Sequence, residues 1–417
     1  MSRRLRLCMI APEYASHPPF GGIATYVRDA AQWLVANGHD VHVVCVNCKG
    51  FIGDEEESCG VHVHYVAPQR IKPRRMLHYA SKLPRLSYLH EAYCGWNLME
   101  ISLGAWLAVR RLTQNAPFDL VECTDFGGLA FWGLWPVHRA RILLRGHGIL
   151  HLDLPFAQRP GGEFHRYLEK VCADKADFIL TVSDYLAQCY RLELNLEHQR
   201  INSWPWPFDF SSQDGLCKGT KTPGEPLTIL YVGRMEYPKG VDLLFEAMVK
   251  AQRRFEGFRC YLIGAASGEF QASLETFLSE NREWVSHLGA LPQHEVFQHM
   301  SKADVLILPS RTETLPRSLV EAASFGLPQI ATHVGGIPEI VEDGVTGLLV
   351  EPDNSDALAE AVLKLCASPD VRAEMGQKSR ERALEKFEIS KVMSKQVQVY
   401  QALVEGESPN DVLGRAV

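Results

Sequence analysis

Two carboxylates eight residues apart, Glu313 and Glu321, are the groups in this chain best placed to do chemistry. The apolar run at 305–309 predicts a buried strand, Pro316 suits the first turn of a helix, and Gly326 suits its end. Glu313 therefore falls in a strand-to-helix loop, at the end of the strand where parallel sheets bind ligands. Carboxylates accept hydrogen bonds from hydroxyls, and N–H groups at a helix start attract anions. The segment predicts a sugar site beside a phosphate; two solvated acids are the alternative.

Two basic residues occupy a similar loop earlier in the chain. Arg234 and Lys239 follow a strand-like run at 227–232, and the stretch after them has apolar residues at helical spacing. A guanidinium fork and a flexible ammonium in one strand-to-helix turn can converge on a diphosphate. Alone the pair is a weak signal, because cations in loops are usually only solvated. The apolar residues that predict the helix are Leu244, Ala247, Met248, Ala251 and Phe255.

The two segments together resemble the family 4 glycosyltransferases, which are retaining enzymes of GT-B fold. The segment that begins at Glu313 is similar to the E-x7-E motif of the family, and Arg234 with Lys239 is similar to its G-R-x4-K-G diphosphate clamp. A glycine-rich stretch at 335–347 continues the family pattern after the next strand. The resemblance extends over nearly the whole chain and is most specific between 227 and 350.

The resemblance assigns roles to individual residues. It implies that the basic pair binds the diphosphate, that Glu313 accepts hydrogen bonds from the donor sugar, and that Glu321 binds the ribose. Thr314 and Pro316 stand where the family frequently has glycine, so the sugar contacts near them remain open. Further donor contacts are implied at Leu291, Leu315, Pro316, Arg317, Ser318 and Leu319.

The N-terminal half supplies a glycine loop and a histidine. Gly21 and Gly22 follow a first strand at 5–10 and precede a helix, so a phosphate could approach the positive end of the helix dipole closely. A lone Gly-Gly is more often only a turn, but the other motifs favour donor binding, and without G-x-G-x-x-G a nicotinamide or flavin dinucleotide is disfavoured. His147 follows another predicted strand and matches the family's histidine at the donor sugar. His147 and Glu313 are therefore the implied catalytic residues.

Strands and helices alternate along the chain, which predicts an α/β fold with parallel sheets. The GT-B resemblance implies two doubly wound Rossmann-like domains facing a central cleft. We expect an acceptor-side domain at 1–208, joined by a C-terminal helix at 391–417, and a donor domain at 209–390. Strands are predicted at 5–10, 41–46, 62–66, 119–123, 142–145 and 178–182, and then at 227–232, 258–263, 304–308 and 328–332.

Composition limits the classes of protein that the chain can belong to. With 417 residues, 46% hydrophobic and 22% charged, it can form two globular domains. A net charge of −7 without a concentrated basic surface argues against nucleic acid as a partner. No apolar stretch reaches the ~20 residues of a spanning helix, and the start runs directly into a strand, so neither a membrane span nor a signal peptide is expected. Eleven cysteines scattered through apolar runs indicate reduced thiols in a cytoplasmic protein.

We expect no metal and no resident cofactor. The lone C-x-x-C at Cys45 and Cys48 has no second pair at zinc spacing, and no Asp-x-Asp stands at a strand end to hold a divalent ion. The donor is instead a co-substrate, and a UDP- or GDP-sugar is the expected one.

A basic segment from Gln69 to His90 is not explained by the donor site. It contains no acid, and its cations are interleaved with apolar and aromatic residues. One interpretation is a solvated loop and helix, or an oligomer contact. The other is a surface for anionic lipid or a lipid diphosphate-linked acceptor, which would place the protein peripherally at the inner membrane face. The basic residues are Arg70, Lys72, Arg74, Arg75, Lys82 and Arg85.

The function predicted from these features is retaining transfer of a sugar from a nucleotide diphosphate sugar to a hydroxyl of a sugar, lipid-linked or small-molecule acceptor. Such reactions build glycans, lipid-linked oligosaccharides and glycolipids. Two alternatives share the scaffold or the motifs. One is a GT-B sugar phosphorylase or epimerase, and the other is a non-catalytic nucleotide-sugar binding protein.

Overall fold

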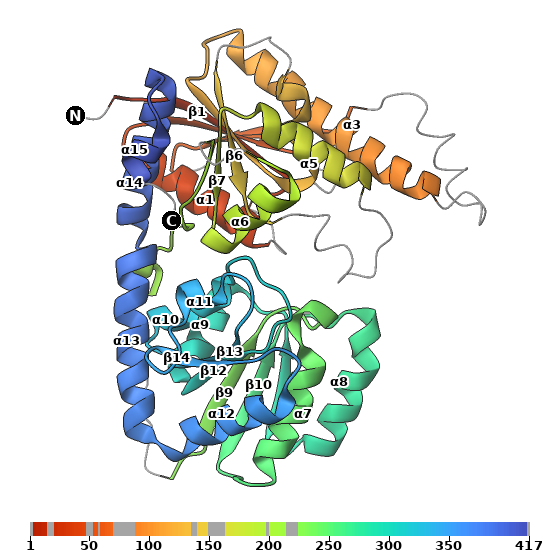
Figure 1. Ribbon diagram of the computed structural model, residues 1–417, viewed down its shortest axis with the longest axis vertical. Helices are drawn as coiled ribbons and strands as arrows, with labels where there is room; N and C mark the ends of the chain where they lie inside the picture. The colour runs from red at the N-terminus through yellow and green to blue at the C-terminus, as the bar shows by residue number, and fades with distance from the viewer. Residues whose placement is uncertain are drawn as a thin grey trace. The chain divides into compact units, whose positions relative to one another are not determined.

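The chain forms two compact units, each built on its own sheet (Figure 1). The first unit comprises Met1–Pro207 and Ile389–Val417, and the second comprises Phe208–Glu388. The computed structural model describes residues 3–14, 21–46, 53–56, 59–69, 88–134, 140–148, 163–196, 200–213 and 224–414.

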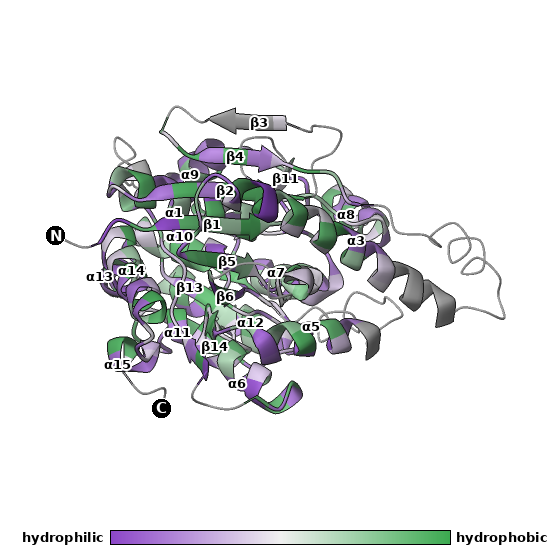
Figure 2. Cartoon of the chain, turned by 90° about the horizontal axis from the view of Figure 1, so that it is seen from above, coloured by the Kyte–Doolittle hydropathy of each residue, from purple (hydrophilic) through white to green (hydrophobic). Residues whose placement is uncertain are grey.

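The first unit contains a sheet with the strand order β3-β4-β2-β1-β5-β6-β7-β8. Every neighbouring pair is parallel except β3 with β4. The middle of the sheet is buried, as nearly continuous apolar runs require, and β5 is drawn in hydrophobic colour in Figure 2. The strands are β1 (Arg6–Ala11), β2 (Asp40–Cys45), β3 (Gly53–Glu56), β4 (His62–Tyr65), β5 (Leu120–Thr124), β6 (Arg141–Gly146), β7 (Phe178–Thr181) and β8 (Ile201–Ser203).

Helices cover this sheet, and the last part of the chain supplies two of them. Tyr26, Val27, Ala30 and Leu34 of the predicted first helix are buried, whereas Ile23 is only half-buried. The C-terminal α14 packs against α1 within the same unit. The elements are α1 (Gly22–Ala36), α3 (Tyr88–Thr113), η2 (Phe126–Gly128), η3 (Phe131–Leu134), α5 (Glu163–Lys175), α6 (Asp184–Glu193), α14 (Ile389–Glu405) and α15 (Pro409–Leu413).

The second unit has an all-parallel sheet with the strand order β11-β10-β9-β12-β13-β14. Its strands are β9 (Leu227–Val232), β10 (Phe258–Ile263), β11 (Val285–Gly289), β12 (Val305–Leu308), β13 (Gln329–Thr332) and β14 (Gly347–Val350). Its helices are η5 (Phe210–Gln213), η6 (Tyr237–Lys239), α7 (Val241–Gln252), α8 (Gly268–Asn281), α9 (Gln293–Lys302), α10 (Arg317–Ser324), α11 (Ile337–Ile340), α12 (Ser355–Ala367) and α13 (Pro369–Phe387).

The predicted fold class, two parallel α/β sheets, is confirmed, and each predicted strand is present to within a residue or so. Four strands were not predicted: β3, β8, β11 and β14 are short or interrupted by polar residues and glycine. Two helix ends differ from the prediction. Phe255 lies beyond the end of α7 and is exposed, and Pro316 is the N-cap of α10 rather than part of its first turn.

The structure describes only some of the residues on which three predictions from composition depend. Among the described residues, no helix is long and apolar enough to cross a membrane. The eight cysteines in the described part of the chain are free thiols. Cys48 and the segment 70–87, which holds all of the basic cluster, lie outside the described residues.

Candidate active site

Glu313 lies in the loop between β12 and α10, and its carboxylate is bound by two side chains of the second unit. Lys239 Nζ lies 2.6 Å from Glu313 Oε1, and Ser310 Oγ donates to the same oxygen at 2.9 Å. The glutamate side chain is 9% exposed. Within the described residues both contacts fall on Oε1, which leaves Oε2 to accept a hydrogen bond from a ligand.

The backbone at Glu313 is held by two glycines that follow β13. The Gly336 N–H donates to the Glu313 carbonyl oxygen at 3.1 Å. Gly335 has a φ of +55°, and a Cβ at this position would overlap the same carbonyl oxygen. Only glycine permits this close approach. The glycine pair therefore acts as a positioning device for the carboxylate.

The packing of two loops places Lys239 beside Glu313. It ends the short η6 after β9, and β9 is the direct neighbour of β12 in the sheet. Gly240 has a φ of +63°, and a Cβ there would overlap the Pro309 carbonyl oxygen. The Arg311 N–H donates to the Pro238 carbonyl at 2.8 Å and joins the loops a second time. The lysine–glutamate pair is thus set by backbone contacts between neighbouring strand ends.

Arg311, which was not predicted, stabilises the same pair of loops. Its guanidinium makes two contacts with Asp242, at 2.8 and 2.7 Å, and one with Asp353 at 2.7 Å. It also lies over the Tyr237 ring, 4.1 Å from the centroid. Burial raises the pKa of Asp242, but the hydrogen bonds and charge of Arg311 outweigh burial and hold that pKa below its usual value. Only the buried guanidinium reveals this role, because the sequence shows merely one more arginine in a loop.

Arg234 lies in the loop after β9, and its side chain is more exposed than that of Lys239. Its side chain is 74% exposed and pairs with Glu236 at 2.9 Å. The Tyr231 hydroxyl donates to the Arg234 carbonyl at 2.8 Å and fixes the backbone there. Arg234 and Lys239 therefore each pair with a glutamate.

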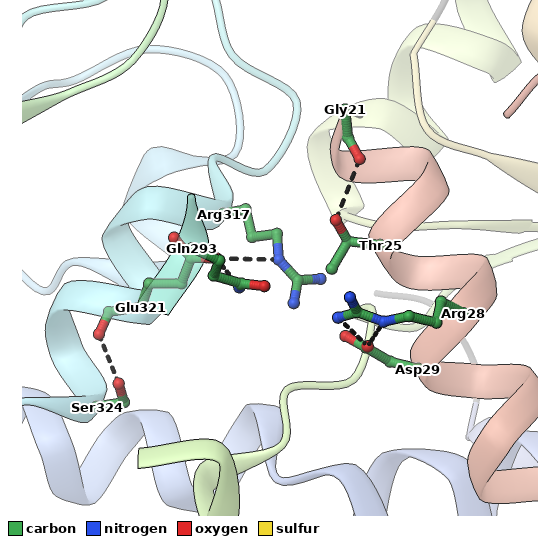
Figure 3. Close-up of polar contacts among 8 residues, drawn as sticks. All are labelled: Gly21, Thr25, Arg28, Asp29, Gln293, Arg317, Glu321 and Ser324. Atoms are coloured by element: carbon green, nitrogen blue, oxygen red, sulfur yellow. Dashed lines mark hydrogen bonds and ion pairs between the residues drawn. The ribbon is translucent and has the colours of Figure 1, made fainter. Parts of the chain in front are cut away.

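Glu321 lies in the second turn of α10 and is 8% exposed. Arg317 Nε donates to Glu321 Oε1 at 3.1 Å, and Gln293 Nε2 donates to the same atom at 3.2 Å (Figure 3). Gln293 begins α9 just after Leu291, which is half-buried. Of the predicted donor contacts, Arg317 is thus a partner of the Glu321 carboxylate, and Leu291 shortly precedes the other partner, Gln293, in the chain.

Pro316, the N-cap of α10, makes no side-chain cap hydrogen bond, and the positive end of a helix suits an anion such as a phosphate. Ser318 is half-buried in this first turn. Leu315 and Leu319 are buried in the core of the unit, and Pro316 is buried at the N-cap. These leucines hold the helix start in place by packing.

In the first unit, α1 begins at the predicted glycine pair. Gly21 is the N-cap, and its carbonyl accepts from both the N–H and the hydroxyl of Thr25, each at 3.2 Å (Figure 3). Side chains added at Gly21 or Gly22 would meet no described atom within 4 Å. The described residues therefore give no steric reason for glycine here, whereas a ligand that approaches the backbone would.

His147 follows β6, and its ring packs against the Tyr26 ring of α1, with centroids 4.9 Å apart. Burial and, to a smaller extent, the positive charge of Arg145 lower the pKa of His147 to about 3. The imidazole is therefore neutral near pH 7.

Asp125 was not predicted, yet it holds the loop that carries His147. Its Oδ2 accepts from the His147 N–H at 2.9 Å, the Gly148 N–H at 3.0 Å and the Tyr190 hydroxyl at 2.8 Å. Burial raises the pKa of Asp125 to about 7, although these three hydrogen bonds oppose the shift. Its Oδ1 is buried and makes no hydrogen bond to any described residue. The available signal was an acid just beyond the predicted strand at 119–123.

Comparison with known protein families divides the chain at nearly the same place as the boundary between the two units. Residues 21–203 match the glycosyl transferase 4-like domain, and residues 216–382 match the glycosyl transferases group 1 domain. The chain belongs to the group 1, or family 4, glycosyltransferases. It is therefore an enzyme of the EC 2.4 class, in a family that uses nucleotide sugar donors, and the predicted family and enzyme class are confirmed.

Relatives of this glycosyltransferase match it over nearly its full length. An uncharacterized glycosyltransferase of Methanocaldococcus jannaschii is 25% identical, over 96% of this chain and 99% of its own. The structure of sucrose-phosphate synthase from Thermosynechococcus elongatus has a TM-score of 0.75 at 20% identity, covering 97% of this chain and 100% of that one. Anabaena HepE in complex with UDP-glucose has a TM-score of 0.70 at 16% identity, over 96% and 100%. The two structures show the GT-B fold.

In this glycosyltransferase, the C-terminal helix α14 holds the Tyr26 ring that packs against His147. The Tyr26 hydroxyl donates to Glu122 Oε1 at 2.7 Å, and the Tyr400 hydroxyl of α14 donates to Oε2 at 2.6 Å. Gln396 Nε2, also on α14, lies 2.8 Å from the Tyr26 hydroxyl oxygen. All four side chains are buried, so the network ties α14, α1 and β5 together behind the histidine.

Proposed function

We propose that this enzyme transfers a sugar from a UDP- or GDP-sugar to an acceptor hydroxyl, with retention at the anomeric carbon. The observation that carries the proposal is the contact between Lys239 and Glu313 at the ends of the neighbouring strands β9 and β12. It places a cation suited to a diphosphate next to a carboxylate suited to sugar hydroxyls. Few other ligands combine those two groups a few ångströms apart.

The difficult step in such a reaction is departure of the nucleoside diphosphate. Lys239, the more exposed Arg234 and the uncapped start of α10 supply positive potential to stabilise the charge that develops on it. Glu313 Oε2 accepts a hydrogen bond from a donor sugar hydroxyl while Oε1 stays with Lys239. Because both groups are already in place, little reorganisation is needed when the donor binds.

The remaining assignments follow the family resemblance. Glu321, oriented by Arg317 and Gln293, accepts from the ribose hydroxyls. Neutral His147, or its backbone carbonyl, lines the reacting face of the sugar. The glycine pair at Gly21 and Gly22 receives the donor phosphates. Donor recognition is thereby proposed for the domain at 209–390, and acceptor recognition for 1–208 with 391–417.

The acceptor is proposed to carry its hydroxyl on a sugar, a lipid-linked sugar or a small molecule, with the enzyme at the cytoplasmic membrane face. The free thiols of the described cysteines are consistent with a reducing compartment. The acid-free segment 69–90 supports a contact with anionic lipid, because each cation near such a surface contributes about 1 kcal/mol.

Reversing the charge of Arg74, Arg75 and Lys82 tests the lipid contact. Sedimentation with vesicles containing phosphatidylserine should fall at least about tenfold and weaken with salt, while nucleotide binding stays unchanged. The matched control reverses Arg110 and Arg111, which are exposed cations at the end of α3. Equal sedimentation of parent and variant would return the segment to a solvated loop or an oligomer contact.

A screen of nucleotide sugars tests the proposed reaction. The purified enzyme is incubated with UDP- and GDP-sugars, with and without EDTA, and the released or transferred sugar is followed by proton NMR. We expect one donor to be consumed, the first-formed sugar to keep the donor's anomeric configuration, and EDTA to leave the rate unchanged. Inversion of the anomeric centre, or full dependence on added magnesium or manganese, would contradict the proposed mechanism.

A further inference from the structure

A group of histidines in the first unit lies far from the strand ends that carry Asp125 and His147. The cluster consists of Asp40 and His42 near the start of β2 and of His62 and His64 near the start of β4. β2 and β4 are parallel to β5 and β6. The amino ends of β2 and β4 therefore lie on the opposite side of the sheet from the carboxyl ends that carry Asp125 and His147. Hydrophilic colour marks β4 in Figure 2, in contrast to the hydrophobic β5.

The strand register brings these side chains to one face. His42 is the cross-strand partner of His62, and the period of two along each strand puts Asp40 with His42 and His62 with His64. The rings of His42 and His62 stack with their centroids 4.8 Å apart. One ligand atom each from Asp40, His42 and His62 lie within 4.8 Å of one another.

The separation of two of these atoms already matches that of a metal's ligands. Asp40 Oδ1 lies 3.4 Å from His42 Nε2. A tetrahedral zinc ion with bonds of about 2.1 Å to nitrogen and oxygen holds its ligand atoms about 3.4 Å apart. His62 is half-buried at the surface, so a small rotation of its side chain can complete a set of three.

The hydrogen bonds also fix the tautomer of His42. Arg6 Nη2 lies 3.1 Å from His42 Nε2, and a guanidinium can only donate, so Nε2 carries the lone pair. The proton therefore sits on Nδ1, which donates to His64 Nε2 at 2.9 Å. Neutral histidine with a lone pair on one nitrogen and the other nitrogen held by a neighbour is the usual state of a metal ligand.

A cation already bridges the first two ligands. Arg6 Nε donates to Asp40 Oδ2 at 2.9 Å while its Nη2 contacts His42. The guanidinium has other partners, because it bonds to the Ala116 carbonyl and lies 4.4 Å from the centroid of the Phe118 ring. It can thus give up Asp40 and His42 to a metal ion and keep a place on Phe118.

We propose that Asp40, His42 and His62 form a binding site for a divalent transition metal such as zinc, with Arg6 in its place when the metal is absent. Two imidazoles and a carboxylate are a ligand set that suits zinc and cobalt, with water in the fourth position. The ion would join β2 to β4 at the edge of the sheet. It would act on stability rather than on transfer, since the proposed reaction takes place at the other ends of the strands.

Cobalt absorption tests the site directly. Untagged full-length enzyme is stripped with EDTA, dialysed, and titrated with Co²⁺, whose visible bands report tetrahedral nitrogen and oxygen ligands. We expect one equivalent of Co²⁺ to bind, Zn²⁺ to displace it, and Zn²⁺ to raise the melting temperature without changing transfer activity. Asp40→Asn and His62→Gln should each weaken Co²⁺ binding at least tenfold.

Two further variants make the test specific. Arg6→Gln removes the competing cation and should tighten Co²⁺ binding several-fold, a result that a nonspecific surface site would not give. His294→Gln, an exposed histidine of the second unit, should leave binding unchanged. No visible band in the parent, equal binding by Asp40→Asn and His62→Gln, or weaker binding by Arg6→Gln would overturn the proposal.

Discussion

The two units place functional groups at strand ends in contrasting ways. In the second unit, charged side chains neutralise one another in pairs, Lys239 with Glu313 and Arg317 with Glu321. In the first unit, Asp125 accepts hydrogen bonds from uncharged donors, and burial shifts the pKa values of His147 and Asp125 toward the uncharged form. A lysine held by a glutamate can take on a diphosphate as a further partner. A neutral histidine can line a sugar without attracting a counterion.

The difference lies in how each unit accommodates the charge of the group that it positions. In both units, contacts to the backbone fix the loop that carries the functional group. Gly335 and Gly336 contact the Glu313 carbonyl, and Asp125 accepts hydrogen bonds from the N–H groups of His147 and Gly148. They differ in whether the group held by the loop carries a charge. Full charge is favoured where an opposite charge lies within hydrogen-bond distance, and burial without such a partner disfavours it.

Removing the charge on Glu313 should have the largest effect on catalysis. Glu313→Gln keeps the shape but weakens the hydrogen bond to the sugar in the transition state, so kcat should fall about a hundred- to a thousandfold. Nucleoside diphosphate affinity should change little. The control is Glu236→Gln, which removes another glutamate–cation pair from the β9 loop. Similar losses of kcat in both variants would point to general electrostatics instead of a specific contact.

Removing the cations should affect binding next. Lys239→Ala and Arg234→Ala should each weaken nucleoside diphosphate binding, measured by calorimetry, by about ten- to a hundredfold, as expected for charge-assisted contacts. Lys239 should matter more, because its side chain is 21% exposed and that of Arg234 is 74% exposed. Lys250→Ala removes a lysine paired with Glu246 on α7 and serves as the control. If both clamp variants bound as tightly as the parent, the clamp assignment would be wrong.

Asp125 should control the stability of the first unit and its dependence on pH. Asp125→Ala leaves three donors without their acceptor and should cost about 2–5 kcal/mol, whereas Asp125→Asn should cost less. The folded pKa of about 7 lies above the unfolded value of about 3.9, so the folded state binds the extra proton. Stability of the parent relative to Asp125→Asn should therefore fall as pH rises from about 4 to 7. Denaturant unfolding at each pH measures this difference, and a rise instead of a fall would mean that the carboxylate is stabilised in the fold.

The smallest expected effect concerns the titration of His147. Its pKa of about 3 keeps the ring neutral between pH 5 and 9, so its charge should not change across that range. Replacement by Gln should lower activity but leave the shape of the kcat/KM profile against pH unchanged. A step near pH 6.5 that disappears in His147→Gln would show that the ring titrates and that the contrast between the units is weaker than the structure indicates.

What could be predicted from sequence was local in the chain. The strands, the two β–α loops and the family were accessible because apolar runs and short motifs contain the whole signal within a few residues. Arg311 and Asp125 were missed because their importance depends on partners brought together by the sheet, such as Asp353 and His147. Short strands such as β8 were missed because three residues give no periodicity.

Two further features depended on parallel register. The histidine cluster was missed because Asp40 and His62 lie 22 residues apart and meet only through the pairing of β2 with β4. The glycines after β13 were recognised as part of a pattern, but their effect on the Glu313 carbonyl needed the fold. In both cases the residue type can be read from the sequence, but its role depends on contacts with residues of a neighbouring strand.

The division of labour between Lys239 and Glu313 can be tested by comparing two ligands. Calorimetry gives the Kd of the nucleoside diphosphate and of its nucleotide sugar for the parent, Lys239→Ala and Glu313→Gln. If Lys239 binds the diphosphate and Glu313 the sugar, Lys239→Ala will weaken both ligands by the same factor. Glu313→Gln will weaken the nucleotide sugar about five- to tenfold more than the nucleoside diphosphate, the share of one hydrogen bond. Equal losses for both ligands in Glu313→Gln, or no loss in Lys239→Ala, would contradict the central assignment.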